Sequence, residues 1–353
     1  MGHPHIWVRH EARSTERRCP VTPDSARRLV EAGARVTVEE STQRIFPLDD
    51  YVAAGAETAP TGSWVDAPED AFVLGLKELP EEPARLRHRH IYFGHAFKGQ
   101  AEAPALLQRF RAGGGTLLDL EYLVADDGRR VAAFGYWAGY LGAALGVLQS
   151  RGALPAPLTP TTREELDASL RAGAGSAPSR ALVTGALGRS GRGATDALAV
   201  AGVTTTRWDL DETRRLDRGA LLDHDLLVHC VLTTTPSEPF VRAADVPAEG
   251  RRLSLLVDVT CDTSHLNLLP VYQDLTSWEA PVSRLADAEG GRPPLDVIAI
   301  DNLPSLLPLE ASRTYAEDLF PTLLTLVTEG DVSPVWARAR ATFEQALATT
   351  PAT

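Results

Sequence analysis

Two segments in the first half of the chain end in side chains that can exchange protons. The string GLKELPEE places Lys77 and Glu78 at the end of an apolar run, and IYFGHAFK places His95 and Lys98 at the end of the next one. Parallel α/β sheets bind their ligands at the carboxyl ends of strands. A lysine and a histidine there can act as acid and base when burial and neighbouring charges, here Glu78 and Glu121, bring their pKa values toward neutrality.

Each member of this pair has an alternative explanation. His95 is equally compatible with a hydrogen-bonded histidine in the core, and Lys77 with a solvated strand end. The two residues together are more informative than either alone. They predict acid–base chemistry at the carboxyl edge of a sheet.

A glycine-rich turn marks a second site in the middle of the chain. Gly185, Gly188 and Gly191 follow the strand-like RALVT with GxxGxxG spacing and precede a helical pattern. Glycines there let backbone N–H groups approach a pyrophosphate at the helix N-terminus. The spacing departs from the usual GxGxxG, and a turn without a ligand is the alternative.

Asp209 strengthens the nucleotide interpretation, because it ends the next strand-like segment 24 residues after Gly185. A carboxylate at that place accepts hydrogen bonds from the ribose hydroxyls of an adenosine. It also repels a 2′-phosphate. The segment therefore predicts a dinucleotide site that prefers NAD(H) to NADP(H).

Apolar runs of strand length alternate with helical patterns along the chain. The first half offers HIWVRH, RVTVEE, AFVLGLKE, HIYFGHAF and TLLDLEYL. The second half offers RALVT, VTTTRWDL, DLLVHCVL, RLSLLVDVT and LDVIAID. This alternation predicts parallel sheets covered by helices on both faces.

The order of these elements predicts an α/β protein with two Rossmann-like domains around a central cleft. A helical segment begins at Phe134, and a helical tail from Pro304 follows the last strand. We expect the tail to fold back onto the first domain. Residues 1–133 and 304–353 would then form a discontinuous substrate and catalytic domain, and residues 134–303 a continuous NAD-binding domain.

Charge and cysteine content narrow the class of protein. The net charge of −12 and the pI near 5.3 argue against a nucleic-acid binder. The start lacks an apolar run long enough for a secretory signal or a membrane span. Cys19, Cys230 and Cys261 lie far apart and form no paired metal spacing. We expect a cytoplasmic protein that binds no metal, nucleic acid or membrane.

Several longer strings add a resemblance to one family. They include VTPDSARRLVEAG, GLKELPEE, GGGTLLDLEYL, GRRVAAFG, AGYLGAALGVL, GALGRSGRGA and DNLPSLLPLEAS, and they are spread over nearly the whole chain. In these strings the chain resembles the NAD-dependent, lysine-forming saccharopine dehydrogenases. That family is a distant relative of alanine dehydrogenase and the transhydrogenases.

The resemblance implies an enzyme of lysine metabolism that interconverts saccharopine with L-lysine and 2-oxoglutarate through an imine, with NAD(H) as cofactor. It implies small-molecule substrates and a monomer or small homo-oligomer. It makes Lys77 and His95 the catalytic acid–base pair. The other implied site residues are Glu78 and Glu121, which modulate the pKa values of that pair; Arg18, Lys98 and Arg130, which bind substrate carboxylates; and Gly185, Gly188, Arg189, Ser190, Gly191, Asp209 and Asp301, which bind the cofactor.

The chain departs from the family pattern in several places. Asn302 replaces a histidine of the family, and the loop at residues 260–272 is one residue shorter. Ser190 stands where some members carry a cysteine, so Cys230 lacks the partner for a disulfide found in those members. Three alternatives therefore stay open: a paralogue that makes a different opine from another amine or amino acid, an alanine-dehydrogenase-like deaminating enzyme, and a non-catalytic NAD-sensing or assembly protein.

Overall fold

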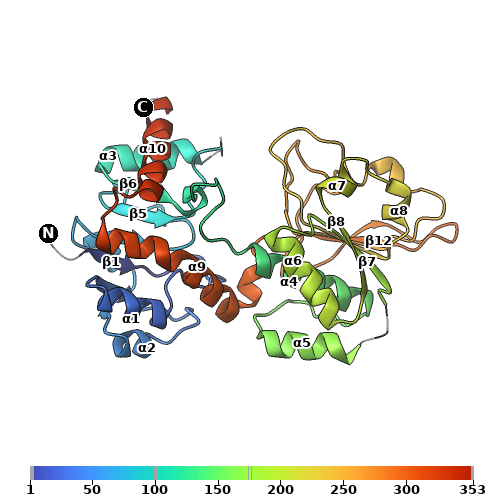
Figure 1. Ribbon diagram of the computed structural model, residues 1–353, viewed down its shortest axis with the longest axis horizontal. Helices are drawn as coiled ribbons and strands as arrows, with labels where there is room; N and C mark the ends of the chain where they lie inside the picture. Colours follow the sequence, from blue (N-terminus) through green and yellow to red (C-terminus); the bar gives the residue numbers. More distant parts are fainter. Residues whose placement is uncertain (1–3, 99, 101, 174, 176, 351–353) are drawn as a thin grey trace. The chain divides into compact units, whose positions relative to one another are not determined.

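The computed structural model describes residues 4–98, 100, 102–173, 175 and 177–350. The chain divides into two compact units, Met1–Ala133 with Ala311–Thr353, and Phe134–Glu310. Each unit contains one six-stranded sheet with helices packed against it (Figure 1). The α/β class and the mostly parallel sheets expected from the sequence are confirmed. The cleft expected between two domains stays a prediction.

The sheet of the first unit is parallel and has the strand order β3-β2-β1-β4-β5-β6. Its strands are β1 (His5–Val8), β2 (Arg35–Glu39), β3 (Glu57–Ala59), β4 (Phe72–Leu74), β5 (Arg89–Tyr92) and β6 (Thr116–Asp119). Its helices are α1 (Pro23–Glu31), α2 (Leu48–Ala53), α3 (Ala103–Gly113), α10 (Pro334–Thr349) and, from Ala311 onward, α9 (Pro308–Thr328), with the short 3₁₀ helices η1 (Ser63–Asp66) and η2 (Leu120–Tyr122). The order reverses between β1 and β4, where open α/β sheets bind ligands.

The sheet of the central unit has the order β11-β12-β10-β9-β7-β8 and reverses between β7 and β9. Its strands are β7 (Arg180–Thr184), β8 (Thr204–Trp208), β9 (Leu226–His229), β10 (Leu255–Asp258), β11 (Ser283–Ala286) and β12 (Leu295–Ile298). Its helices are α4 (Gly135–Ser150), α5 (Arg163–Ala172), α6 (Arg189–Val200), α7 (Leu210–Thr213) and α8 (Arg218–Leu222), with the 3₁₀ helices η3 (Ala243–Asp245) and η4 (Leu303–Leu306).

Two edge strands, β3 and β11, were not predicted from the sequence. β3 is three residues long and polar, and β11 pairs antiparallel with β12. Both lie at sheet edges and carry side chains that are exposed or half-buried. A strand that is not buried on both faces needs no continuous apolar run, so the pattern that located the other strands could not find these two.

The chain returns to the first unit at Ala311, whereas we expected the return at Pro304. The intervening segment is held within the central unit by hydrogen bonds to the residues before and at the start of α5. Thr161 donates its N–H to the Leu306 carbonyl at 2.8 Å, and Arg163 donates its N–H to Glu310 Oε1 at 2.8 Å. η4 is also fully buried.

Helices α4 and α6 of the central unit touch through their backbones. A Cβ atom on Gly193 would lie 2.9 Å from the carbonyl carbon of Tyr136 and 3.0 Å from the nitrogen of Tyr140. A Cβ atom on Gly139 would lie 2.5 Å from the carbonyl carbon of Ser190. These glycines therefore bring α6, which follows the glycine-rich turn, directly against α4.

We predict that Gly193→Ala lowers the free energy of unfolding by about 1 to 3 kcal/mol, because the added methyl group overpacks the contact between α4 and α6. Urea denaturation followed by circular dichroism measures the change. Gly219→Ala is the matched control, since a Cβ atom there meets only Asp217 Oδ1 at 3.4 Å. Equal stability of the two variants would contradict the close packing.

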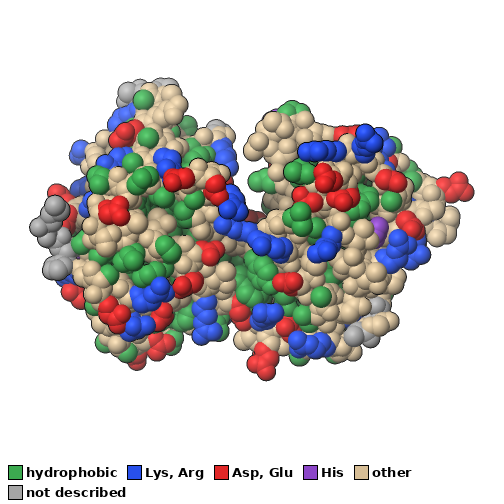
Figure 2. Space-filling model, viewed as in Figure 1, with side chains coloured by type: hydrophobic (Ala, Val, Ile, Leu, Met, Phe, Trp, Pro, Cys, Tyr) green, Lys and Arg blue, Asp and Glu red, His purple; other side chains and the backbone are tan. Residues whose placement is uncertain are grey.

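The visible face of each unit mixes Lys and Arg with Asp and Glu and also carries scattered apolar side chains (Figure 2). Among the described residues, no helix combines the length and the apolar character needed to cross a bilayer.

Candidate active site and nucleotide-binding turn

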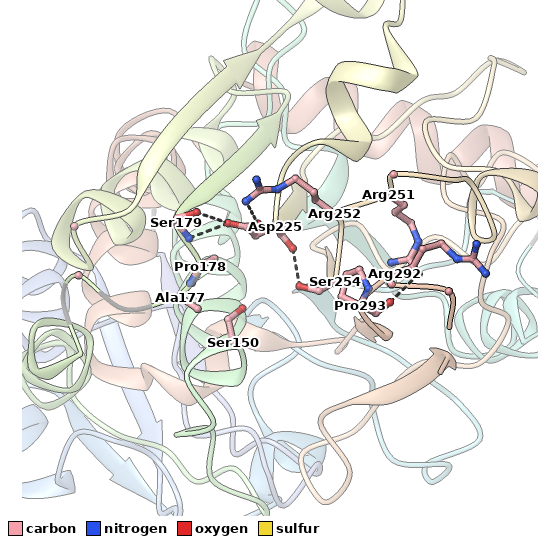
Figure 3. A pocket seen from close by; sticks show the side chains of 15 residues that line it. Ser150, Ala177, Pro178, Ser179, Asp225, Arg251, Arg252, Ser254, Arg292 and Pro293 are labelled. Carbon is pink, nitrogen blue, oxygen red and sulfur yellow. Dashed lines mark hydrogen bonds and ion pairs between the residues drawn. The ribbon is translucent and has the colours of Figure 1, made fainter. Parts of the chain in front are cut away.

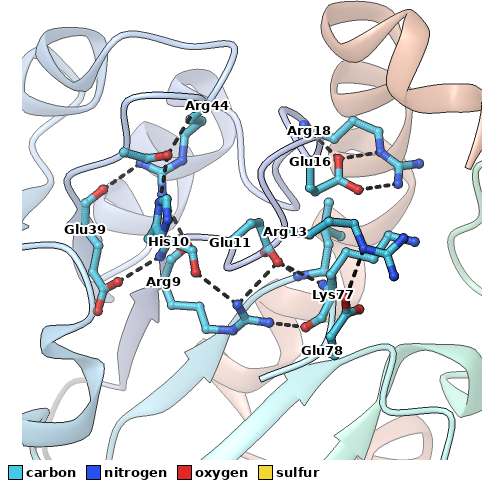
Figure 4. Close-up of polar contacts among 12 residues, drawn as sticks. Arg9, His10, Glu11, Arg13, Glu16, Arg18, Glu39, Arg44, Lys77 and Glu78 are labelled. Atoms are coloured by element: carbon cyan, nitrogen blue, oxygen red, sulfur yellow. Dashed lines mark hydrogen bonds and ion pairs between the residues drawn. The ribbon is translucent and has the colours of Figure 1, made fainter. Parts of the chain in front are cut away.

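Lys77 lies at the reversal point of the first sheet, three residues beyond the end of β4. It is half-buried. Its main-chain N–H donates to Glu11 Oε2 at 2.9 Å, and its carbonyl accepts a hydrogen bond from Arg9 Nη2 (Figure 4). The main chain of Lys77 therefore belongs to an ordered segment, and its role as an acid or base stays a prediction.

Glu121 joins the second candidate acid–base residue to a lysine. Its Oε1 lies 2.7 Å from Lys98 Nζ, and its Oε2 lies 3.9 Å from His95 Nδ1. The His95 side chain is 59% exposed, so it is no core histidine. The structure thus brings His95, Lys98 and Glu121 together on the loops that follow β5 and β6.

Asp119, the last residue of β6, orders both of these loops and was missed by the sequence analysis. Its Oδ2 accepts the Gly94 N–H at 3.1 Å, and its Oδ1 accepts the Glu121 N–H at 2.8 Å. Burial raises the pKa of this carboxyl to about 7, and the charge of Glu121 adds to that effect. The acidic residue inside the apolar string TLLDLEYL was the only available signal.

Glu78 lies beside Lys77 in the chain but pairs with a different side chain. Arg13 Nε donates to Glu78 Oε1 at 3.0 Å, and both side chains are exposed. Burial works to raise the pKa of Glu78, yet a backbone hydrogen bond and Arg13 lower it overall.

Arg18 is buried and bound to Glu16, a carboxylate that the sequence analysis also missed. Arg18 Nε donates to Glu16 Oε1 at 2.8 Å, and Nη2 donates to Oε2 at 2.6 Å (Figure 4). Burial opposes ionisation of Glu16, but Arg18 and then Lys77 lower its pKa. Glu16 is therefore an anion within electrostatic reach of Lys77. Arg130, by contrast, is exposed, and its main chain forms an isolated antiparallel β-bridge with Val124.

The glycine-rich turn of the central unit lies at the reversal point of the second sheet, between β7 and α6. Gly185 has φ +67°, a conformation that favours glycine. Gly188 caps α6, and Arg189 and Ser190 form its first residues. A Cβ atom on Gly191 would lie 2.5 Å from Ala186 Cα, so the helix packs directly on the turn.

Asp209 is tied to this turn. It caps α7, its Oδ1 accepts the Leu210 N–H at 2.9 Å, and its Oδ2 accepts the Leu187 N–H at 2.9 Å. The turn and the carboxylate predicted to bind the ribose are thus neighbours.

Asp301 and the loop at residues 260–272 lie at the same edge of this sheet. Asp301 is exposed and adds to the effects, of which burial is the largest, that raise the pKa of the Cys261 thiol. The loop is fastened at both ends to Asp258, the last residue of β10, which accepts the Thr260 N–H at 2.8 Å and the Tyr272 hydroxyl at 2.7 Å.

A cavity of about 870 Å³ lies at the opposite, amino-terminal edge of this sheet (Figure 3). Its guanidinium groups already bind protein oxygens: Arg251 Nη2 donates to the Pro293 carbonyl, Arg252 to Asp225, and Arg292 to Glu289. These arginines therefore provide no ready anion site, and none of the predicted site residues lines the cavity.

The small number of lysines in the sequence could have strengthened the prediction of the catalytic site. Of the 35 cationic Lys and Arg side chains, only Lys77 and Lys98 are lysines, and the other 33 are arginines. An arginine stays protonated in proteins, whereas a lysine amine can lose its proton. The chain thus keeps lysine only at two positions of the predicted catalytic site.

Comparisons with known proteins define the class first. A model of the alanine dehydrogenase/PNT N-terminal domain matches residues 7–141. The fold is similar to that of L-alanine dehydrogenase, with TM-score 0.66, 19% identity, and coverage of 98% of this chain and 94% of the other. A transhydrogenase from Sinorhizobium meliloti gives TM-score 0.62, 15% identity, and coverage of 92% and 94%. The protein has the two-unit fold of alanine dehydrogenase and transhydrogenase.

Sequence relatives then define the family. Saccharopine dehydrogenase [NAD(+), L-lysine-forming] of Emericella nidulans is 41% identical over 100% of both chains, and that of Yarrowia lipolytica is 41% identical over 96% of both. The protein belongs to the family of NAD(+)-dependent, L-lysine-forming saccharopine dehydrogenases, as the resemblance in its motifs had indicated.

We predict a pH-dependent contribution of Asp119 to stability. Its pKa of about 7 lies above the usual unfolded value near 3.9, so the folded state favours the protonated form and loses stability as pH rises toward 7. Asp119→Asn removes this titration and is the reference. Relative to that variant, the wild type should lose roughly 2 kcal/mol of its free energy of unfolding between pH 5 and pH 7. Urea denaturation at each pH measures it, and a constant difference would contradict the raised pKa.

Proposed function

We propose that this protein is an NAD(H)-dependent oxidoreductase that interconverts saccharopine with L-lysine and 2-oxoglutarate. The observation that carries the proposal is the identity of about 40% to saccharopine dehydrogenases over essentially the full length of both chains. The presence of Lys77, His95, Lys98 and Glu121 at the carboxyl edge of one sheet supports it.

The residues of the central unit fit a dinucleotide. Gly185 and Gly188 place no side chain at two positions of the turn, and Gly188 begins α6 without a side-chain cap, so the amino terminus of this helix is suited to a pyrophosphate. Asp209 provides acceptors for the ribose, and the exposed leucines Leu187 (71%) and Leu210 (67%) beside it offer an apolar surface to the adenine. When bound, NAD(H) carries the hydride of the reaction.

In this proposal the first unit performs the proton transfers. Lys77 holds or releases the proton of the secondary amine, and His95 serves the addition of water and the carbinolamine steps. Glu121 orients His95 and Lys98 by its two oxygens. Saccharopine bears three carboxylates, and Arg130 is exposed to receive one of them. Arg18 and Lys98 are paired with Glu16 and Glu121, so in this proposal each exchanges its protein carboxylate for one of the substrate when the substrate binds.

The first test follows NADH absorbance with 2-oxoglutarate and either L-lysine, another amine, ammonia or no amine. We expect oxidation that depends on L-lysine and yields saccharopine. Turnover with a different amine only would favour a paralogue that makes another opine. Turnover with ammonia and a simple keto acid would indicate an alanine-dehydrogenase-like reaction, and NADH binding without any turnover would indicate a sensor.

We predict that Asp209→Ala weakens NADH binding by at least tenfold and reduces discrimination against NADPH, because the carboxylate both binds the ribose and repels a 2′-phosphate. Fluorescence titration of NADH and NADPH measures both effects.

Asp217→Ala is the matched control, since Asp217 caps the neighbouring helix α8 by accepting the Ala220 N–H at 3.0 Å. Both variants lose a helix cap, worth about 1 kcal/mol. Only Asp209→Ala should change cofactor affinity and preference, and identical binding by both variants would place the ribose contact elsewhere.

A further inference from the structure

The peptide of Lys77 is held by a buried carboxylate that follows β1. Glu11 Oε1 accepts the Leu76 N–H at 2.7 Å, and Oε2 accepts the Lys77 N–H at 2.9 Å. Glu11 is buried. The two carboxylate oxygens therefore bind the main-chain N–H groups of Lys77 and the residue before it, in the segment that follows β4, the strand next to β1 in the sheet.

Arg9 binds the main-chain carbonyl of the same residue, Lys77. Its Nη2 donates to the Lys77 carbonyl, its Nη1 donates to the His10 carbonyl at 2.9 Å, and Nη1 lies 3.3 Å from Glu11 Oε2 (Figure 4). The guanidinium also lies over the ring of Tyr92, 5.7 Å from its centroid. Arg9 is only 2% exposed.

Gly75 makes room for this arginine. A Cβ atom at position 75 would lie 2.5 Å from Arg9 Cζ and 2.7 Å from Arg9 Nη2, closer than any side chain can approach. Packing therefore explains the glycine at position 75. Because it has no side chain, the guanidinium of Arg9 can occupy the space between β1 and the segment after β4.

A buried ion pair is weak evidence for stability, because removing two charges from water costs several kcal/mol per ion. The Arg9–Glu11 pair instead forms hydrogen bonds with both the main-chain N–H and the main-chain carbonyl of Lys77. This arrangement restrains the backbone of Lys77 from which its amine extends.

We propose that Arg9 and Glu11 are positioning residues for Lys77, and that Gly75 is the complement that lets Arg9 reach the Lys77 carbonyl. The inference rests on the proposed function, in which Lys77 exchanges a proton with the substrate amine. Neither residue needs to touch the substrate. The pair acts by fixing where the amine of Lys77 stands.

The small number of lysines makes a direct test possible. Reductive methylation with ¹³C-formaldehyde labels only the amines of Lys77 and Lys98 and the amino terminus, because the chain has no other lysine. Lys98→Arg assigns the lysine signals. In Glu11→Gln the Lys77 signal should change its chemical shift and its midpoint of titration, while the Lys98 signal should keep both.

Turnover is the second readout. Glu11→Gln keeps one acceptor but turns an amide N–H₂ toward the other main-chain N–H, so the Lys77 peptide should shift. We expect kcat to fall on the order of 10- to 100-fold, with the affinity for NADH unchanged.

Asp225→Asn is the matched control. Asp225 lies in the central unit, directly before β9, and its Oδ2 accepts the main-chain N–H groups of Ser179 at 2.9 Å and Arg180 at 3.0 Å, neither of which belongs to the Lys77 segment. It should lose stability as Glu11→Gln does but leave the Lys77 signal and kcat near their wild-type values. Equal effects of the two variants on the Lys77 signal would overturn the proposal.

Gly75→Ala keeps the proposal testable if Glu11→Gln does not fold. The added methyl group should displace Arg9 from the Lys77 carbonyl and leave the Glu11 hydrogen bonds in place. We expect the same selective change of the Lys77 signal, and an unchanged signal in a folded variant would overturn the proposal. The labelling result stands apart from the reaction, so a wild type inactive with L-lysine would contradict the proposed function and not the positioning role.

Discussion

A strand that leaves a buried sheet carries its main-chain N–H groups into the next turn, where each of them needs an acceptor. In this protein buried carboxylates supply the acceptors at four strand ends. Glu39, Asp119 and Asp258 are the last residues of β2, β6 and β10, and Glu11 follows β1. Each accepts at least two N–H groups from turn segments.

The segments that carry the candidate site residues depend on this arrangement. Glu11 holds the segment of Lys77, Asp119 holds the loops of His95 and Glu121, and Asp258 holds the loop at residues 260–272. These buried acceptors are therefore distinct from Glu78 and Glu121, the acidic residues that are predicted to modulate the pKa values of Lys77 and His95.

The sequence predicted the features that leave a local pattern. Apolar runs located the central strands of both sheets, the glycine spacing located the turn before α6, and the longer motifs indicated the family. The edge strands β3 and β11 left no such pattern. Glu11, Glu16 and Asp119 were missed because a buried acceptor looks like any other acidic residue until its donors, far away in the chain, are known. The roles of the individual site residues stay predictions.

The contact between α4 and α6 has a consequence for how the nucleotide site can change over evolution. No amino acid is smaller than glycine, so any replacement at Gly139 or Gly193 can only push the two helices apart. Substitutions at these two glycines can therefore increase the distance between α4 and α6 but cannot decrease it. Selection for tighter or altered cofactor binding is left to act on the other side of the turn, at Asp209 and its exposed apolar neighbours.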